Sequence, residues 1–151
     1  MTSPTLPPSD DRVQTWLTLL QGHGYRLTTP RRAVVETIAA SDRSLSPADV
    51  YDLARAGCPT LGLVTVYRTL EKLEELGAIQ RVHHTHGCQA FVAQVPGHNH
   101  LLLCQQCGRV EYFTGDELEP LMTNVAHYSG YEIRAHWLQL LGLCQACRAS
   151  S

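Results

Sequence analysis

Apolar residues recur at helical spacing through the first half of the chain, and turn residues divide them into four segments. In the first segment they fall three or four positions apart, and Gly22 closes it. Thr29 and Ser46 are each followed by proline, which is the pattern of a helix cap and a first helical residue. Gly77 follows the last segment. The four predicted helices cover residues 10–22, residues from Thr29 onward, residues 46–56 and residues 63–76.

Short runs of strand character replace the helical spacing after Gly77. Residues 78–82 and 89–92 flank a turn at residues 85–87, which predicts a β-hairpin. Short helices followed by a hairpin form a winged helix-turn-helix, in which the fourth helix would enter the major groove of DNA. Its predicted exposed face carries Thr65, Tyr67, Arg68, Thr69 and Lys72. Arg and Thr side chains suit base edges, but an ordinary solvated helix face has the same composition.

A different pattern begins after residue 96. Residues 101–103 and 110–113 are short strand candidates, residues 116–127 predict a helix, and residues 131–138 alternate as a strand. The fold class is therefore predicted as α+β, with a winged helix-turn-helix followed by a small α/β domain. The predicted parts are a disordered lead-in at 1–9, a winged-helix domain at 10–93, a hinge at 94–97 and a second domain at 98–151.

Two Cys-x-x-Cys pairs occur only in this second domain, at Cys104/Cys107 and Cys144/Cys147. Four thiolates at this spacing form the ligand set of a closed, tetrahedral zinc site that contributes folding energy. The pairs therefore predict one structural Zn²⁺. Redox-active or free thiols are the less favoured alternative.

Composition narrows the class of protein but not its partner. The chain has 151 residues, of which 44% are hydrophobic and 17% charged, as in globular proteins, and its net charge of −2 neither supports nor excludes DNA binding. No run is long enough to span a membrane, and the start lacks a secretion signal, so we expect a cytoplasmic protein without a membrane partner. No nucleophile or pocket for a small organic substrate is indicated, so an enzyme is not expected.

Four motifs, in order along the chain, resemble those of the ferric uptake regulator family, most of all its zinc uptake regulator branch. They are Gly24–Arg31, Leu63–Leu70, the run from His98-Asn99-His100 through Cys104 to Val110, and the run from Gly130 to Cys147. The resemblance implies a homodimeric, metal-sensing repressor, with the second domain as the metal-binding dimerisation domain. It also implies AT-rich inverted-repeat operators before metal-uptake genes, and DNA contacts at Arg26, Tyr67 and Arg68.

A regulatory metal site is expected where the hairpin meets the hinge. Cys88 and His86, with His83 and His84 beside them, are the candidates on the hairpin, and His98 and His100 are those after the hinge. A thiolate with imidazoles favours zinc over iron or manganese. Each of these residues also has a simple structural interpretation without a metal. The histidines can be exposed hairpin or loop residues, and Cys88 can be a small buried residue.

A second set resembles the family's other site and comprises Glu119, His136 and one hinge histidine. The alternative for Glu119 is a solvated side chain at the start of a helix. The alternative for His136 is a core histidine with its hydrogen bonds satisfied. Glu111 is a further candidate ligand of this additional site. The family's usual acidic ligand position holds Tyr112, however, and Glu111 lies one position early, on the opposite face of a strand. This departure argues against an iron-type or peroxide-type site.

The leading hypothesis is a repressor that responds to Zn²⁺, which would join the hairpin ligands to the hinge histidines and close the two winged helices of a dimer onto operator DNA. A regulator on the same fold that responds to Mn²⁺, Fe²⁺ or peroxide is the alternative. Remote alternatives are a zinc-dependent enzyme and a zinc-stapled interaction module.

Overall fold

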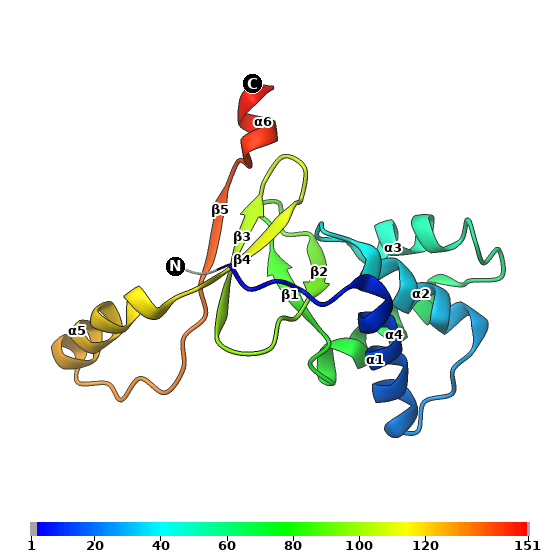
Figure 1. Cartoon of the computed structure of the whole chain (residues 1–151), viewed down its shortest axis with the longest axis horizontal. Helices are drawn as coiled ribbons and strands as arrows, with labels where there is room; N and C mark the ends of the chain where they lie inside the picture. Colours follow the sequence, from blue (N-terminus) through cyan, green and yellow to red (C-terminus); the bar gives the residue numbers. More distant parts are fainter. Residues whose placement is uncertain (1–2, 151) are drawn as a thin grey trace.

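The computed structural model describes residues 3–150 of the chain. Four helices are followed by a two-stranded antiparallel hairpin of β1 and β2 (Figure 1). The bounds are Ser9–Gly22 for α1, Thr29–Ala40 for α2, Pro47–Ala54 for α3, Leu63–Glu75 for α4, Ile79–His83 for β1 and Gln89–Ala93 for β2. The predicted winged-helix elements are thus confirmed to within about two residues at most ends.

Local hydrogen bonds explain where these helices begin. Ser46 and Asp49 form a capping box at α3, in which each side chain accepts a hydrogen bond from the other residue's backbone N–H. At α2 the cap is Thr28, whose hydroxyl accepts a hydrogen bond from the Arg31 N–H at 3.3 Å. The prediction of Thr29 as the cap was therefore one residue late, because the extended backbone falls at Thr28.

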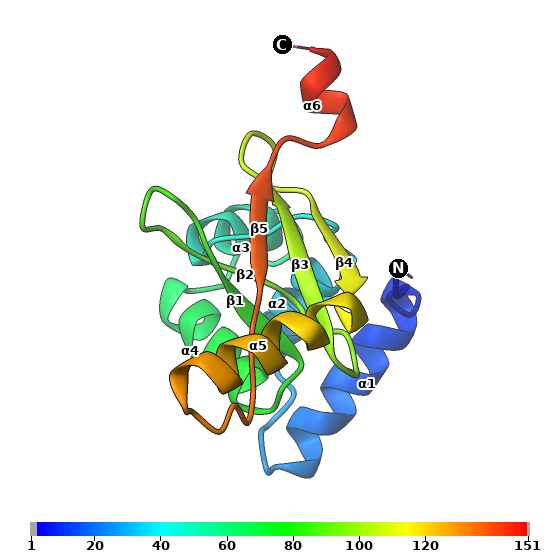
Figure 2. The same cartoon turned by 90° about the vertical axis from the view of Figure 1, so that its left-hand side faces the viewer.

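The second half forms a three-stranded sheet with strand order β4-β3-β5 (Figure 2). β4 is antiparallel to β3, and β5 is parallel to it. The bounds are Asn99–Cys104 for β3, Val110–Thr114 for β4, Asp116–Leu118 for the 3₁₀ turn η1, Glu119–Ser129 for α5, Gln139–Gly142 for β5 and Gln145–Ala149 for α6. α5 projects from the sheet to one side, and β5 leads to α6 at the C-terminal end (Figure 1).

The strand predicted at residues 131–138 is wrong, because β5 begins only at Gln139. β3 pairs with β5 only from Leu101 onward, so the residues before Gln139 form no ladder with β3. They instead face α5, and residues of the two segments line a common hollow.

A second hydrophobic cluster joins the hairpin to the three-stranded sheet, next to the main core among the helices. We call it the shared cluster, and its buried members are Val82, Ala90, Val92, Val95, Leu101, Leu103 and Tyr112. The Tyr112 hydroxyl donates a hydrogen bond to the Ala93 carbonyl at 2.5 Å. Burial raises the pKa of Tyr112, which keeps this donor protonated.

Two further contacts tie the winged-helix part to the sheet. The Ser44 N–H donates to the Gly108 carbonyl at 2.8 Å, and the Val110 N–H donates to the Asp42 carbonyl at 3.0 Å. Gly108 has φ +74°, and a Cβ there would lie 3.2 Å from the Ser44 hydroxyl, so glycine permits this close approach. The loop before α3 therefore runs beside β4.

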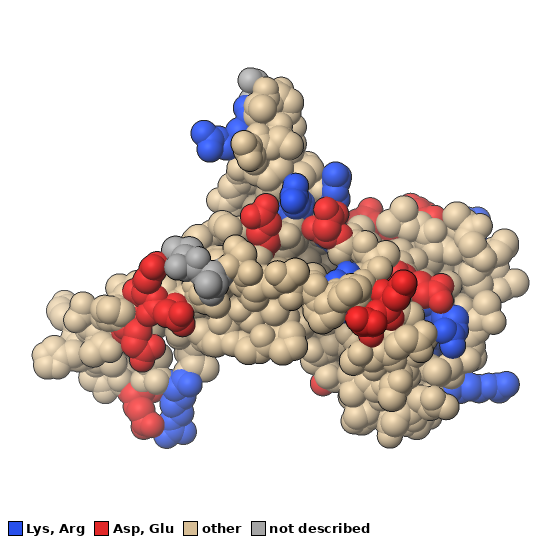
Figure 3. Space-filling view, viewed as in Figure 1, with Lys and Arg blue, Asp and Glu red and all other residues tan. Residues whose placement is uncertain are grey.

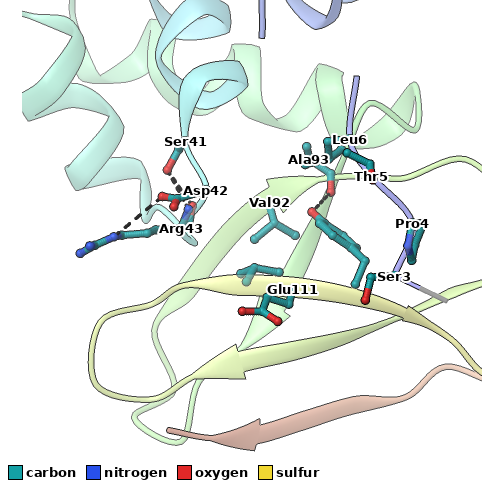
Figure 4. Close-up of a pocket in the computed structure, with 12 residues that line it drawn as sticks. Ser3, Pro4, Thr5, Leu6, Ser41, Asp42, Arg43, Val92, Ala93 and Glu111 are labelled. Carbon is teal, nitrogen blue, oxygen red and sulfur yellow. Dashed lines mark hydrogen bonds and ion pairs between the residues drawn. The ribbon is translucent and has the colours of Figure 1, made fainter. Parts of the chain in front are cut away.

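Part of the predicted lead-in packs against both clusters. Leu6 contacts the main core and the shared cluster, and Ser3–Leu6 border a hollow beside Ala93 and Glu111 (Figure 4). The predicted disorder of residues 1–9 did not foresee the packing of Leu6. Met1 and Thr2, which belong to the same predicted segment, lie outside the described residues. Within the described residues, no helix is long and apolar enough to cross a membrane.

Replacing the buried tyrosine tests the junction between the two halves. We expect Tyr112→Phe to lower the free energy of unfolding by about 1–3 kcal/mol, because the buried Ala93 carbonyl loses its donor. Tyr128→Phe is the matched control, since Tyr128 is 95% exposed on α5 and should change stability by less than about 0.5 kcal/mol. Urea unfolding of both variants gives the comparison. Equal stabilities would remove Tyr112 from the account of the junction.

Candidate metal centres and DNA-binding surface

The four cysteines of the two Cys-x-x-Cys pairs meet at one point, where they form the four-cysteine group. Cys104 ends β3, Cys107 lies in the following turn, Cys144 precedes α6 and Cys147 lies in it. The four sulfur atoms lie within 4.8 Å of one another, and the sulfurs of Cys107 and Cys144 are 3.8 Å apart. Zn–S bonds of about 2.3 Å place the sulfurs of a tetrahedral site about 3.8 Å apart, so the group fits a structural zinc ion.

Hydrogen bonds already set different protonation states within this group. The Cys144 N–H donates to the Cys104 sulfur at 3.3 Å, and this bond, with others from the Cys107 knuckle, lowers the pKa of Cys104 to about 6. A hydrogen bond with Cys144, together with burial, raises the pKa of Cys147 to about 12 in the protein without an ion. Zinc binding at neutral pH must therefore release thiol protons, so zinc affinity rises with pH.

A second group of metal-ligating side chains lies at the start of β3. We call His98, His100 and His136 the histidine group, and their ligand nitrogens lie within 4.8 Å of one another. The Nε2 atoms of His98 and His136 are 2.8 Å apart. Gly97, with φ +95°, turns the backbone just before His98. His98 and His100 lie two positions apart on extended backbone, which points both side chains to the same side.

His100 is the most informative member of the histidine group. It is 1% exposed, and neither ring nitrogen has a hydrogen-bond partner. Buried polar atoms without partners are rare in folded proteins, and two such nitrogens beside other imidazoles fit a metal-binding role. Burial lowers the pKa of His100, and His98 and His136 lower it further, so the imidazole is held in the neutral form that binds metals.

Space for this ring depends on a glycine. A Cβ at Gly115 would overlap Cδ2 and Nε2 of His100, so any larger residue at position 115 displaces the imidazole. Glu119, at the start of α5, lines the same hollow as His98 and His136. Its carboxylate lies outside the group of atoms within 4.8 Å.

The hairpin candidates lie elsewhere. Cys88 is exposed, and in the part of the chain that the structure describes it belongs to no group of three or more metal-ligating residues. Cys88 precedes β2, whereas the hinge leaves the far end of this strand, and five extended residues span about 16 Å. The expected grouping of Cys88 and His86 with the hinge histidines is therefore not formed in this arrangement.

The neighbouring residues of the hairpin have other contacts. The His84 Nε2 atom lies 3.1 Å from the Ser44 hydroxyl, and the His83 ring packs edge-on against Trp137. Glu111 is exposed and faces away from the shared cluster, as its predicted position on the opposite face of the strand from Tyr112 requires. Its Oε1 atom lies 3.6 Å from Nε of Arg109. One hinge histidine was predicted beside His136, whereas the structure places both His98 and His100 there. The burial of His100 leaves no signal in the local pattern.

The candidate DNA-binding surface is the exposed face of α4. Tyr67 is 49% exposed, and Arg68 and Arg26 are exposed as well, while Thr65 is half-buried. Thr69 is 1% exposed, so its predicted place on the outer face is wrong. It falls on the helical stripe of buried residues that also includes Val66, Leu70 and Leu73.

Two basic side chains near this surface make specific contacts. Arg31 and Lys72 lie 5.7 and 5.6 Å from the centre of the Tyr25 ring, and Arg31 donates to the Arg26 carbonyl. On the face shown in Figure 3, acidic and basic side chains are interspersed, as the net charge of −2 leads one to expect.

Comparison with known proteins agrees with this arrangement. The model of the ferric uptake regulator family matches residues 22–141. A ferric uptake regulation protein of Bacillus subtilis is 31% identical over 142 residues, which cover 91% of this chain and 95% of the relative. Another, from Neisseria meningitidis, is 30% identical over 131 residues, which cover 86% of this chain and 91% of the relative.

Among solved structures, a zinc uptake regulator complexed with zinc and DNA is 25% identical to this chain. It superposes with a TM-score of 0.68 over 96% of this chain and 98% of its own. Members of the matched family are metal-responsive transcriptional regulators that bind DNA operators as dimers, and they are not enzymes. The four-cysteine group, the helix-turn-helix and the match over residues 22–141 together show that this chain belongs to the ferric uptake regulator family.

Proposed function

We propose that this protein is a zinc-responsive, homodimeric repressor that acts in the cytoplasm on AT-rich inverted-repeat operators of metal-uptake genes. The observation that carries the proposal is the histidine group, in which a buried His100 without hydrogen-bond partners lies beside His98 and His136. Imidazole nitrogens suit Zn²⁺, whereas Mn²⁺ prefers carboxylates and water. Among the described residues, Cys88 lies outside this group.

Two metal ions per chain would have separate tasks. The four-cysteine group would hold a structural Zn²⁺ that joins the β3–β4 turn to α6. The histidine group, with Glu119 within the same hollow, would hold the regulatory ion. A bound Zn²⁺ supplies charge and directional bonds that fix the positions of its ligands. His136 would then be held against the start of β3.

The α4 surface would form the DNA contact. Arg68 and Tyr67 are exposed there, and the half-buried Thr65 is within the same helical turn. Arg26 lies just before α2, beside the ordered side chain of Arg31. In a dimer, these residues from two copies would contact two half-sites. Metal that favours the DNA-competent arrangement must bind more tightly when DNA is bound.

An iron-responsive regulator is the second candidate. It is favoured by the two curated relatives at 30% and 31% identity, which are ferric uptake regulation proteins. Histidine with a carboxylate also suits Fe²⁺. The metal titration described below separates the two candidates.

Loss of one cysteine tests the structural zinc. We expect Cys107→Ser to lower the zinc content of purified protein by one ion per chain, because the group loses one of its four ligands. His136→Ala is the control and should retain that zinc after dialysis. The wild-type zinc should also be lost more readily as pH falls, since protons compete for the thiolates. Unchanged zinc in Cys107→Ser would contradict the structural site.

The regulatory site is tested by metal-dependent DNA binding. We expect Zn²⁺ to increase wild-type affinity for an AT-rich inverted repeat at least about tenfold, and His136→Ala to remove this increase. Cys88→Ser is the matched control and should respond as the wild type does. Fluorescence anisotropy with Zn²⁺, Mn²⁺ and anaerobic Fe²⁺ gives the measurement. Loss of the response in Cys88→Ser alone would move the site to the hairpin, and a response to Fe²⁺ alone would favour the second candidate.

The DNA surface is tested at Arg68. Arg68→Ala should weaken operator binding roughly 5- to 150-fold, as expected for loss of one good base contact of about 1–3 kcal/mol. Zinc content and dimerisation should not change. Arg109→Ala is the control, because Arg109 lies near Glu111 beside β4. The same loss in both variants, or a loss of dimerisation in Arg68→Ala, would argue against a contact role.

A further inference from the structure

The four residues that precede and open β5 contact two different parts of the molecule. His136 belongs to the histidine group. Trp137 packs its ring against that of His83, with centroids 5.4 Å apart and planes at 75°. Gln139 forms two hydrogen bonds with the backbone of His83. One short segment therefore connects the candidate metal site to the end of the hairpin.

The Gln139 side chain forms two hydrogen bonds with the His83 backbone, as the backbone of a neighbouring strand would. Its Oε1 atom accepts from the His83 N–H at 3.0 Å, and its Nε2 atom donates to the His83 carbonyl at 2.6 Å. His83 is the last residue of β1 and pairs with Gln89 of β2 on its other side. The backbone of Gln139 meanwhile pairs with Leu101 in the three-stranded sheet. Gln139 therefore links the three-stranded sheet, through its backbone, to the hairpin, through its side chain.

The connecting segment is short and stiff. Only Trp137 and Leu138 separate His136 from Gln139, and neither is a glycine. The Leu138 carbonyl accepts from the Leu101 N–H at 3.2 Å, which holds the segment to β3. Three residues of extended chain span about 10 Å, so a shift of His136 is passed to Trp137 and Gln139 with little slack.

We infer that Trp137 and Gln139 form a latch that transmits occupancy of the histidine group to the hairpin. When His136 is fixed beside His98 and His100, the latch holds His83 and with it the end of β1. When His136 is released, the latch loosens, and the end of β1 loses this connection to the C-terminal sheet, while the packing of the hairpin in the main core and the shared cluster remains. Because β1 follows α4 after a short turn, this difference reaches the DNA-binding helix.

This inference rests on the proposed function, because it requires the histidine group to be the regulatory site. It assigns positioning residues and not metal ligands. The latch lies outside the four-cysteine group and away from the exposed face of α4. Replacing it should therefore leave metal binding and direct DNA contacts in place, and should reduce only the coupling between them.

Gln139→Met tests the latch, since it keeps the length of the side chain and removes both hydrogen bonds. We expect the ratio of operator affinity with and without Zn²⁺ to fall by about fivefold to tenfold, the effect of two modest hydrogen bonds. Zinc bound at the cysteines should match the wild type, which establishes that the variant folds. Gln14→Met, at an exposed position on α1, is the control and should keep the wild-type ratio.

Hydrogen exchange of the His83 amide supplies a readout without DNA. In the wild type, Zn²⁺ should slow this exchange, because Gln139 accepts the His83 hydrogen bond. In Gln139→Met the slowing should be lost. Trp137→Leu, which removes the ring contact and keeps the hydrogen bonds, should lower the affinity ratio in the same direction.

The outcomes separate the latch from the proposed function. If His136→Ala abolishes the response to Zn²⁺ while Gln139→Met and Trp137→Leu keep the full ratio and the slowed exchange, the latch is overturned and the regulatory site stands. If His136→Ala itself responds as the wild type does, the regulatory site and the latch both fail. If the ratio falls in all three variants with cysteine-bound zinc intact, the latch is supported.

Discussion

The shared cluster between the hairpin and the C-terminal sheet fixes where each candidate functional residue lies. Val92 on β2 and Leu101 on β3 are buried together, and Tyr112 on β4 closes the cluster with its bond to Ala93. An apolar contact of this kind requires no ion, because burial of the side chains stabilises it directly. Under the proposed function, metal at the histidine group would act on an arrangement that packing already favours, and it would only have to shift an existing equilibrium.

The sequence predicted those features that depend on neighbours along the chain. The cap at Ser46 and most of the buried stripe of α4 follow from local spacing, so the four helices of the winged part were predicted to within about two residues at most ends. The two Cys-x-x-Cys pairs were informative for the same reason. Each pair sets the separation of two thiols within one turn, and zinc chemistry then requires the two turns to meet.

Features that depend on contacts across the fold were missed. The alternation of residues 131–138 resembles a strand, but only the register with Leu101 shows where a partner is available. The grouping of His100 with His136 depends on how β3 and the segment before β5 lie side by side, and no local pattern encodes the burial of that imidazole. Cys88 suggested a site through its chemistry, yet the length of β2 separates it from the hinge.

Gly115 has a consequence that reaches beyond this molecule. It donates nothing to a metal, but the volume that it leaves empty is the volume that the His100 ring occupies. A relative with a smaller side chain at position 100 would be free of that steric constraint at position 115. Positions 100 and 115 should therefore vary together during evolution, so that the side chain at a residue without any ligand atom records which kind of metal site a family member carries.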